Sequence, residues 1–266
     1  MAVIGFIGSG NMGSAIINSI AKTKKHKILI YDINRELALQ VANESNSMSV
    51  ELETLLSDSD IIFLAVKPQI LPSLYKDLKG RGKKWISIAA GVSLATLKKN
   101  LGSDQIVRLM PNIATEVGKS VTALCATGET DESFIKESIA IAESFGSVYL
   151  LDEKLFGAFV GSSASAIATV FAFINGLALG AVKEGLSYSQ ALNIVCSTTF
   201  GALKLLESSK AHPEELISKV CSPGGTTIES VTLLENSGFK GILIDSVSVA
   251  SQRAQQLEEK ANKENQ

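Results

Sequence analysis

A glycine-rich turn between an apolar segment and a segment with helical spacing constrains the fold of this chain more than any other feature. Residues 2–7 are apolar, and residues 12–22 have the spacing of a helix. In a strand–turn–helix unit, the first glycine permits the turn, the second lets the backbone approach a pyrophosphate, and the third lets the helix pack on the strand. The turn therefore predicts a dinucleotide site. Its candidate cofactor-binding residues are Gly8, Ser9, Gly10, Asn11, Met12 and Gly13.

An acidic residue at the end of the second predicted strand, residues 27–31, supports this interpretation. Asp32 lies about twenty residues after the turn, where a carboxylate bonds the adenosine ribose hydroxyls. A carboxylate there favours NAD because it repels a 2′-phosphate. Asn34 and Arg35 follow at once, however, and an arginine can pair with that phosphate. Arg35 is equally well explained as a solvated residue in the first turn of a helix, so the expected cofactor is NADPH or NADH.

Strand-like and helix-like segments alternate through the first half of the chain. Seven strands are predicted, at residues 2–7, 27–31, 61–66, 85–89, 105–109, 121–126 and 148–151. Such alternation is typical of an α/β fold with a doubly wound, mostly parallel sheet, here a Rossmann-like domain over residues 1–151. Only helices are predicted after that, so residues 152–266 form an all-helical domain. The polar tail, residues 258–266, is expected to be a fraying, solvated end.

Composition excludes several classes of protein. Lys and Arg number 25 against 27 Asp and Glu, so no charge excess indicates nucleic acid or an anionic membrane. Three cysteines without a C-x-x-C pair, together with two histidines, argue against a disulfide framework or a metal site and favour the cytoplasm. Residues 157–182 carry no charge and are long enough to span a bilayer. Their many small and polar residues instead favour a helix buried in an oligomer core.

Four further segments appear in order along the chain. They are Ala65-Val66-Lys67-Pro68, Ala89-Ala90-Gly91-Val92, Arg108-Leu109-Met110-Pro111-Asn112 and Ser222-Pro223-Gly224-Gly225-Thr226-Thr227-Ile228. With the glycine turn they resemble the pyrroline-5-carboxylate reductase family, whose members make L-proline with NAD(P)H, over essentially the whole chain. The resemblance implies that Val66, Lys67, Pro68 and Ala90 line the cofactor and that Asn112 lies near the nicotinamide.

The resemblance also implies a substrate site. Backbone N–H groups of Gly225, Thr226 and Thr227 would bind the carboxylate of the imino acid, with Thr227 near the ring nitrogen as the catalytic candidate. A capping role for Thr227 is compatible with this. Glu153 and Ser165 match family positions near the substrate. Hydride would pass to the imine carbon and a proton to the nitrogen. The resemblance further implies that residues 152–266 are a dimerisation and substrate domain and that a homodimer forms by interleaving these helical domains, with assembly beyond the dimer left open.

Several departures from the family pattern gather around the predicted substrate and nicotinamide. Residues 164–169 stand where the family has G-S-G-P-A-Y, and Ile113-Ala114 replaces T-P after Asn112. Lys210 and Lys219 replace an acidic residue and an asparagine. These changes keep two alternatives open: a related reductase for another cyclic imine or keto acid, and a non-catalytic NAD(P)-binding regulatory protein of the same fold.

Overall fold

The computed structural model describes residues 2–265 and divides into two compact units. One comprises Met1–Ala164 and Ala250–Gln266 and is called the sheet unit below. The other, Ser165–Val249, is called the helical unit. The sequence-based boundary between residues 151 and 152 thus differs from the division by packing, because residues 152–164 and 250–265 pack with the sheet.

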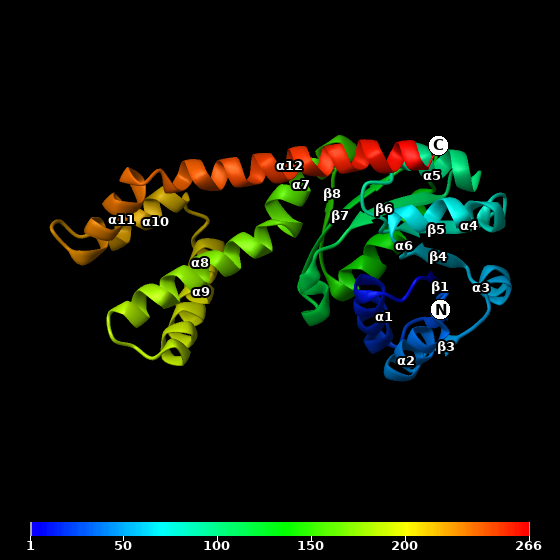
Figure 1. The fold of residues 1–266 in the computed structure, drawn as a ribbon, viewed down its shortest axis with the longest axis horizontal. Coiled ribbons are helices and arrows are strands. Elements are labelled where there is room, and N and C mark those ends of the chain that lie inside the picture. The colour runs from blue at the N-terminus through cyan, green and yellow to red at the C-terminus, as the bar shows by residue number, and fades with distance from the viewer. Residues whose placement is uncertain (1, 266) are drawn as a thin grey trace. The chain divides into compact units, whose positions relative to one another are not determined.

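The sheet unit is built around one eight-stranded sheet, in the order β3-β2-β1-β4-β5-β6-β7-β8 (Figure 1). Its strands are β1 (Val3–Ile7), β2 (Lys27–Tyr31), β3 (Met48–Ser49), β4 (Ile61–Leu64), β5 (Lys84–Ser87), β6 (Ile106–Met110), β7 (Ser120–Ala126) and β8 (Gly146–Leu150). Neighbouring strands are parallel except β6 and β7. The chain winds from β1 to β2 on one side and returns to β4 on the other, so the predicted doubly wound sheet is confirmed. Ligands of such sheets bind at this reversal, beyond the carboxyl ends of the strands.

Alternate residues of the central strands build one core on each face of the sheet, as the two-residue period of a strand requires. Ile62 and Leu64 face one core, while Ile61 and Phe63 face the other, where Phe63 stacks on Phe6 at 4.5 Å between ring centroids. Helices α1 (Asn11–Thr23), α2 (Arg35–Ser45) and α6 (Glu132–Ala142) cover the second core. Helices α3 (Leu52–Asp58), α4 (Leu71–Leu78) and α5 (Leu94–Leu101) cover the first core.

The last helix, α12 (Phe239–Glu264), ends against the sheet unit beside α5 (Figure 1). Asn265 is 3% exposed and accepts a hydrogen bond from the Tyr75 hydroxyl at 2.9 Å. Asn262 accepts from the backbone N–H of Ser93 at 3.0 Å. The expectation of a solvated, fraying tail is therefore wrong, because the polar side chains that suggested it bind groups of α4 and α5.

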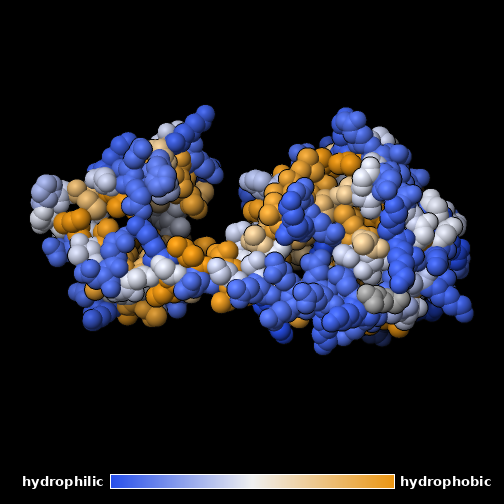
Figure 2. All heavy atoms as spheres, turned by 90° about the horizontal axis from the view of Figure 1, so that it is seen from above, coloured by the Kyte–Doolittle hydropathy of each residue, from blue (hydrophilic) through white to orange (hydrophobic). Residues whose placement is uncertain are grey.

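The helical unit has a small core of its own. It contains α8 (Ala166–Lys183), α9 (Tyr188–Ser209), α10 (Pro213–Val220), α11 (Thr226–Asn236) and the first part of α12. Helices α8 and α9 pack together around Ala178, Ala191 and Val195, the buried residues of this unit. Many large apolar side chains remain on its surface, as the orange spheres in Figure 2 show. They include Phe171, Leu177, Leu179, Ile194, Phe200 and Leu203.

A continuous helical segment leads into α8. It passes through the turn Glu153–Leu155, α7 (Phe156–Phe159) and a π-helical turn, Val160–Ala164. By length and composition alone, Glu153–Lys183 is the one helix within residues 2–265 that could cross a membrane. In its most apolar 18-residue window only 6% of the residues are buried within a single chain, which fits a helix that packs against another protein surface as well as one in lipid.

Candidate functional site

The glycine turn after β1 has a different constraint at each glycine. Gly8 has φ +101°, and a Cβ there would lie 2.6 Å from the carbonyl oxygen of Ala65 in the segment that follows β4. A Cβ at Gly13 would lie 2.7 Å from the carbonyl oxygen of Gly8, so this glycine lets α1 approach the strand. Gly10 has nothing within 4 Å of the place where its Cβ would stand. The first and third glycines thus serve the fold, while the second leaves open space above the turn.

That open space lies at the N-terminus of α1. Gly10 is the N-cap and contributes no side-chain hydrogen bond, and the first turn of the helix contains no acidic residue. The free backbone N–H groups and the positive end of the helix dipole therefore face a cradle that a Cβ would fill. A pyrophosphate fits these features in shape and in charge.

Asp32, directly after β2, accepts hydrogen bonds from the glycine turn. One carboxylate oxygen accepts from the backbone N–H of Ser9 at 2.7 Å and from its hydroxyl at 3.0 Å. The other accepts from the N–H of Asn34 at 2.9 Å. A carboxylate offers about four acceptor positions and three are taken, so one remains for a ribose hydroxyl. The structural role of Asp32 toward Ser9 was missed by sequence reasoning, which assigned the carboxylate to the ligand alone.

The two polar residues that follow Asp32 have partners within the protein. Asn34 caps α2, where its side-chain oxygen accepts from the N–H of Leu37 at 3.2 Å. Arg35 forms an ion pair with Glu51 at 2.7 Å between nitrogen and oxygen. Arg35, Glu51 and Asp32 line one hollow at the carboxyl ends of β2 and β3.

The other predicted cofactor residues follow β4, β5 and β6. In the segment after β4, Lys67 is exposed, while Val66 and Pro68 are partly buried. This segment lies against the glycine turn, since a Cβ on Gly8 would lie 2.9 Å from Val66 Cγ1. Ala90 lies in the turn between β5 and α5. The parallel sheet thus brings these segments to the edge where β1 ends.

Asn112 follows β6 and is 4% exposed. Its side-chain oxygen accepts from the N–H groups of Ala114 at 3.2 Å and Val121 at 3.4 Å. Its amide nitrogen donates to the hydroxyl of Ser163 at 3.1 Å. Most of its hydrogen-bonding capacity is therefore used inside the protein, and one amide hydrogen is left for a ligand.

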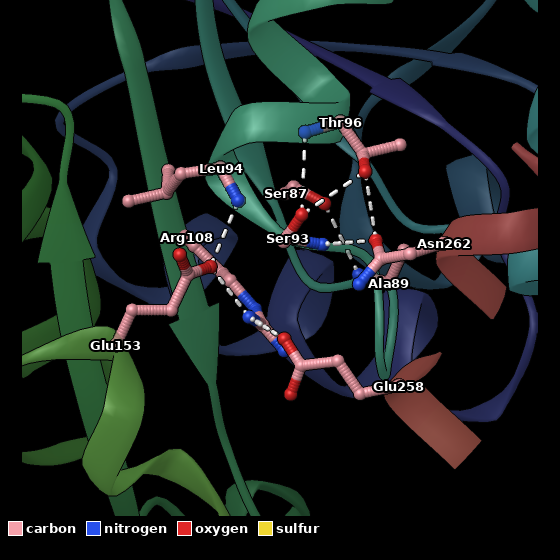
Figure 3. Close-up of polar contacts among 9 residues, drawn as sticks. All are labelled: Ser87, Ala89, Ser93, Leu94, Thr96, Arg108, Glu153, Glu258 and Asn262. Atoms are coloured by element: carbon pink, nitrogen blue, oxygen red, sulfur yellow. Dashed lines mark hydrogen bonds and ion pairs between the residues drawn. The ribbon is translucent and has the colours of Figure 1, made fainter. Parts of the chain in front are cut away.

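Glu153, predicted near the substrate, takes part in an ion cluster around the buried Arg108 in the sheet unit (Figure 3). Arg108 is 1% exposed, and its Nη1 donates to Glu153 at 2.6 Å and to Glu258 at 2.7 Å. Glu153 also accepts from the N–H of Leu94 at 2.8 Å. Burial by itself lowers the pKa of Arg108, but the carboxylates of Glu258 and Glu153 outweigh it, so the pKa is raised. Sequence reasoning missed this cluster; its one signal was a charged residue inside the apolar strand β6.

The remaining candidates lie in the helical unit. The loop Cys221–Gly225 enters α11, with Gly225 as N-cap and Thr226 and Thr227 in the first turn. Gly224 has φ +68°, and the N–H of Gly225 donates to the carbonyl of Ser222 at 3.1 Å. Gly225 makes no side-chain cap, so the first N–H groups of α11 are available to an anion. Ser165, exposed, precedes α8.

Two family models match this chain, one in its N-terminal part and one in its C-terminal part. Residues 153–257 match the family model described as pyrroline-5-carboxylate reductase dimerisation, and residues 3–91 match NADP oxidoreductase coenzyme F420-dependent. The pyrroline-5-carboxylate reductase of Aquifex aeolicus is 38% identical over 96% of this chain and 97% of its own length. The enzyme of that name from Escherichia coli is 32% identical over 96% and 97%.

A solved structure agrees as well. The 1-pyrroline-5-carboxylate reductase of Streptococcus pyogenes superimposes with a TM-score of 0.88 at 31% identity, covering 96% of this chain and 98% of that one. The resemblance inferred from the motifs is therefore confirmed, and the chain belongs to the pyrroline-5-carboxylate reductase family.

Proposed function

We propose that this protein reduces 1-pyrroline-5-carboxylate to L-proline with NADPH or NADH. The observation that carries the proposal is the glycine turn, whose open Gly10 faces an uncapped helix N-terminus while Gly8 and Gly13 are needed by the fold. Family membership over nearly the full chain supports the imino-acid substrate. When bound, the reduced nicotinamide supplies the hydride.

The chain's own residues bind and orient the two reactants. The N–H groups that begin α1 hold the pyrophosphate, and Asp32, itself held by Ser9, accepts from a ribose hydroxyl. In the helical unit, the N–H groups of Gly225, Thr226 and Thr227 hold the substrate carboxylate. The Thr227 hydroxyl oxygen accepts a hydrogen bond from the ring N–H of the imine, which is already protonated at neutral pH, and orients the imine carbon to receive hydride. Such a reaction needs positioning more than a strong acid.

The test follows NADH and NADPH oxidation with pyrroline-5-carboxylate. Gly10→Ala is expected to keep the fold, because its Cβ meets no protein atom, and to weaken nucleotide binding by about tenfold or more, because the methyl occupies the phosphate cradle. Thr227→Ala is expected to lower kcat by about tenfold, the worth of one hydrogen bond, while Thr227→Ser retains most activity. Thr232→Ala, which removes an exposed hydroxyl from the same helix, is the matched control. Nucleotide binding without turnover of this imine would refute the proposed substrate.

The helical unit is proposed to form a homodimer. Its buried core is limited to three residues, whereas α8 and α9 expose large apolar side chains that a second copy would cover. Light scattering is expected to give twice the chain mass of 28.1 kDa, or an even multiple if dimers assemble further. Phe171→Glu should reduce the assembly, whereas Met48→Glu, an equally drastic change on the sheet unit, should not. A wild-type mass of one chain would contradict the dimer.

A cytoplasmic location is proposed on two grounds. The charge balance is near neutral, and Cys125, Cys196 and Cys221 are all free thiols.

A further inference from the structure

The hollow at the carboxyl ends of β2 and β3 has an unusual balance of charge for a site that would accept an additional phosphate. Its lining contains three charged side chains, those of Asp32, Arg35 and Glu51. Two of these are carboxylates and one is a guanidinium. The hollow begins at Asp32, the residue proposed above to accept from the adenosine ribose, so the group at the ribose 2′ position would face it.

The one cation in this lining is already engaged. Arg35 Nη2 lies 2.7 Å from Glu51 Oε1. Glu51 immediately precedes α3, and its side chain makes no capping hydrogen bond, so its carboxylate serves the ion pair alone among the described contacts. Arg35 is the first residue of α2, which places its side chain at the rim of the hollow.

The residues between Asp32 and Arg35 do not supply a second cation. Ile33 is apolar and 91% exposed. Asn34 uses its side-chain oxygen to cap α2. The charge that meets a ligand at this position is therefore set by Asp32, Arg35 and Glu51.

NADH and NADPH differ only at the 2′ position of the adenosine ribose, which carries a hydroxyl in NADH and a phosphate in NADPH. The 2′-hydroxyl of NADH donates a hydrogen bond, and Asp32 retains one acceptor position beside its three protein donors. A 2′-phosphate instead brings about −1.5 to −2 charges and faces two carboxylates. It can reach the remaining N–H groups of Arg35, but the Glu51 carboxylate beside them offsets part of that attraction.

We propose that Glu51, by holding Arg35 in an ion pair beside Asp32, makes this site prefer NADH over NADPH. Glu51 is thus a specificity-determining residue of the dinucleotide site, on which the proposal rests. Nothing in the glycine turn discriminates between the two nucleotides, because both carry the same pyrophosphate.

The test measures dissociation constants of NADH and NADPH by nucleotide fluorescence, on the full-length protein without imine substrate. Wild type is expected to bind NADH about tenfold more tightly, from the repulsion between a phosphate dianion and the carboxylates. Glu51→Gln should lower the dissociation constant of NADPH about fivefold, which is about the most that an exposed ion pair contributes. The dissociation constant of NADH should change by less than about twofold, because its 2′-hydroxyl carries no charge. Glu53→Gln is the matched control: it removes the same charge from the first turn of α3, but its partner is Arg81 and it does not line the hollow.

A double variant tells whether NADPH binds more tightly because Arg35 is released or because a negative charge is lost. In Glu51→Gln/Arg35→Met, the gain in NADPH binding should disappear. If the gain persists there, or if wild type binds NADPH as tightly as NADH, or if Glu53→Gln acts like Glu51→Gln, the proposal is overturned. Failure to reduce pyrroline-5-carboxylate would contradict the proposed reaction but leave these binding ratios standing. Failure to bind either nucleotide would overturn both.

Discussion

Replacing Arg108 by methionine is expected to destabilise the sheet unit by about 2–4 kcal/mol. Methionine fills much of the volume of this buried side chain but leaves Glu153 and Glu258 without a counter-charge (Figure 3). Breaking a fully buried ion pair by removing one partner costs about 3–5 kcal/mol. The lower range applies here because the two glutamates keep 28% and 25% of their side-chain surface in solvent and can turn toward water.

The chain contains its own probe for this measurement. Trp85 is the single tryptophan and is fully buried in β5, so its fluorescence during urea unfolding reports on the sheet unit. Arg81→Met is the matched control, because Arg81 also pairs with a glutamate at 2.7 Å but with side chains 38% and 70% exposed. The control is expected to cost less than about 1 kcal/mol, as exposed ion pairs do.

A triple variant tests the cause of the loss. Adding Glu153→Gln and Glu258→Gln to Arg108→Met removes the uncompensated charges, while the glutamine oxygen at position 153 still accepts from Leu94. We expect the triple variant to recover a large part of the lost stability. Equal losses in Arg108→Met and Arg81→Met, or a triple variant no more stable than the single one, would refute the reasoning from buried charge.

Three further predictions follow from local geometry. Gly13→Ala should lower the thermal midpoint while Gly10→Ala does not, because only the first places a Cβ 2.7 Å from a carbonyl oxygen; equal midpoints would contradict the role given to these glycines. Cys125 should resist alkylation at pH 8 in the native protein, because burial and then the nearby Glu153 carboxylate raise the pKa of its thiol to about 12; counting modified Cys125 by mass spectrometry before and after denaturation checks this, and equal modification in both states would contradict it. Asn265→Ala should lower the free energy of unfolding by about 1–3 kcal/mol in the same fluorescence assay, because it leaves the buried Tyr75 hydroxyl without an acceptor. An unchanged urea midpoint would show that this contact of the tail contributes nothing to stability.

The parts of the fold that sequence reasoning predicted are those encoded in contiguous residues. The glycine turn and the strand before it lie within about a dozen positions, and each glycine is explained by backbone contacts of β1, α1 and the segment after β4. The start of α11 was predicted in the same way, from a Gly-Gly pair followed by threonines. Such signals need no knowledge of distant residues.

The parts that it missed depend on distant partners or on short elements. Arg108 is separated from Glu258 by 150 positions, and no local spacing relates them. Helices α3, α4 and α5 have seven or eight residues each, too few for a convincing helical period. The polar tail was taken for a solvated end because its composition does not reveal that Asn262 and Asn265 meet α4 and α5.

Several residues assigned to ligands by sequence also maintain the architecture of the site. Asp32 holds the glycine turn, Asn112 joins the loop after β6 to Ser163, and Glu153 joins Arg108 to the start of α5. Loss of activity on replacing any of them therefore does not identify a ligand contact, since the site would deform as well. Thr227 differs, because its side chain lies in the first turn of α11 where Gly225, not Thr227, is the N-cap. Activity lost in Thr227→Ala at an unchanged thermal midpoint, and restored in Thr227→Ser, would therefore be evidence for chemistry, whereas a lowered midpoint would reduce its role to support of the helix.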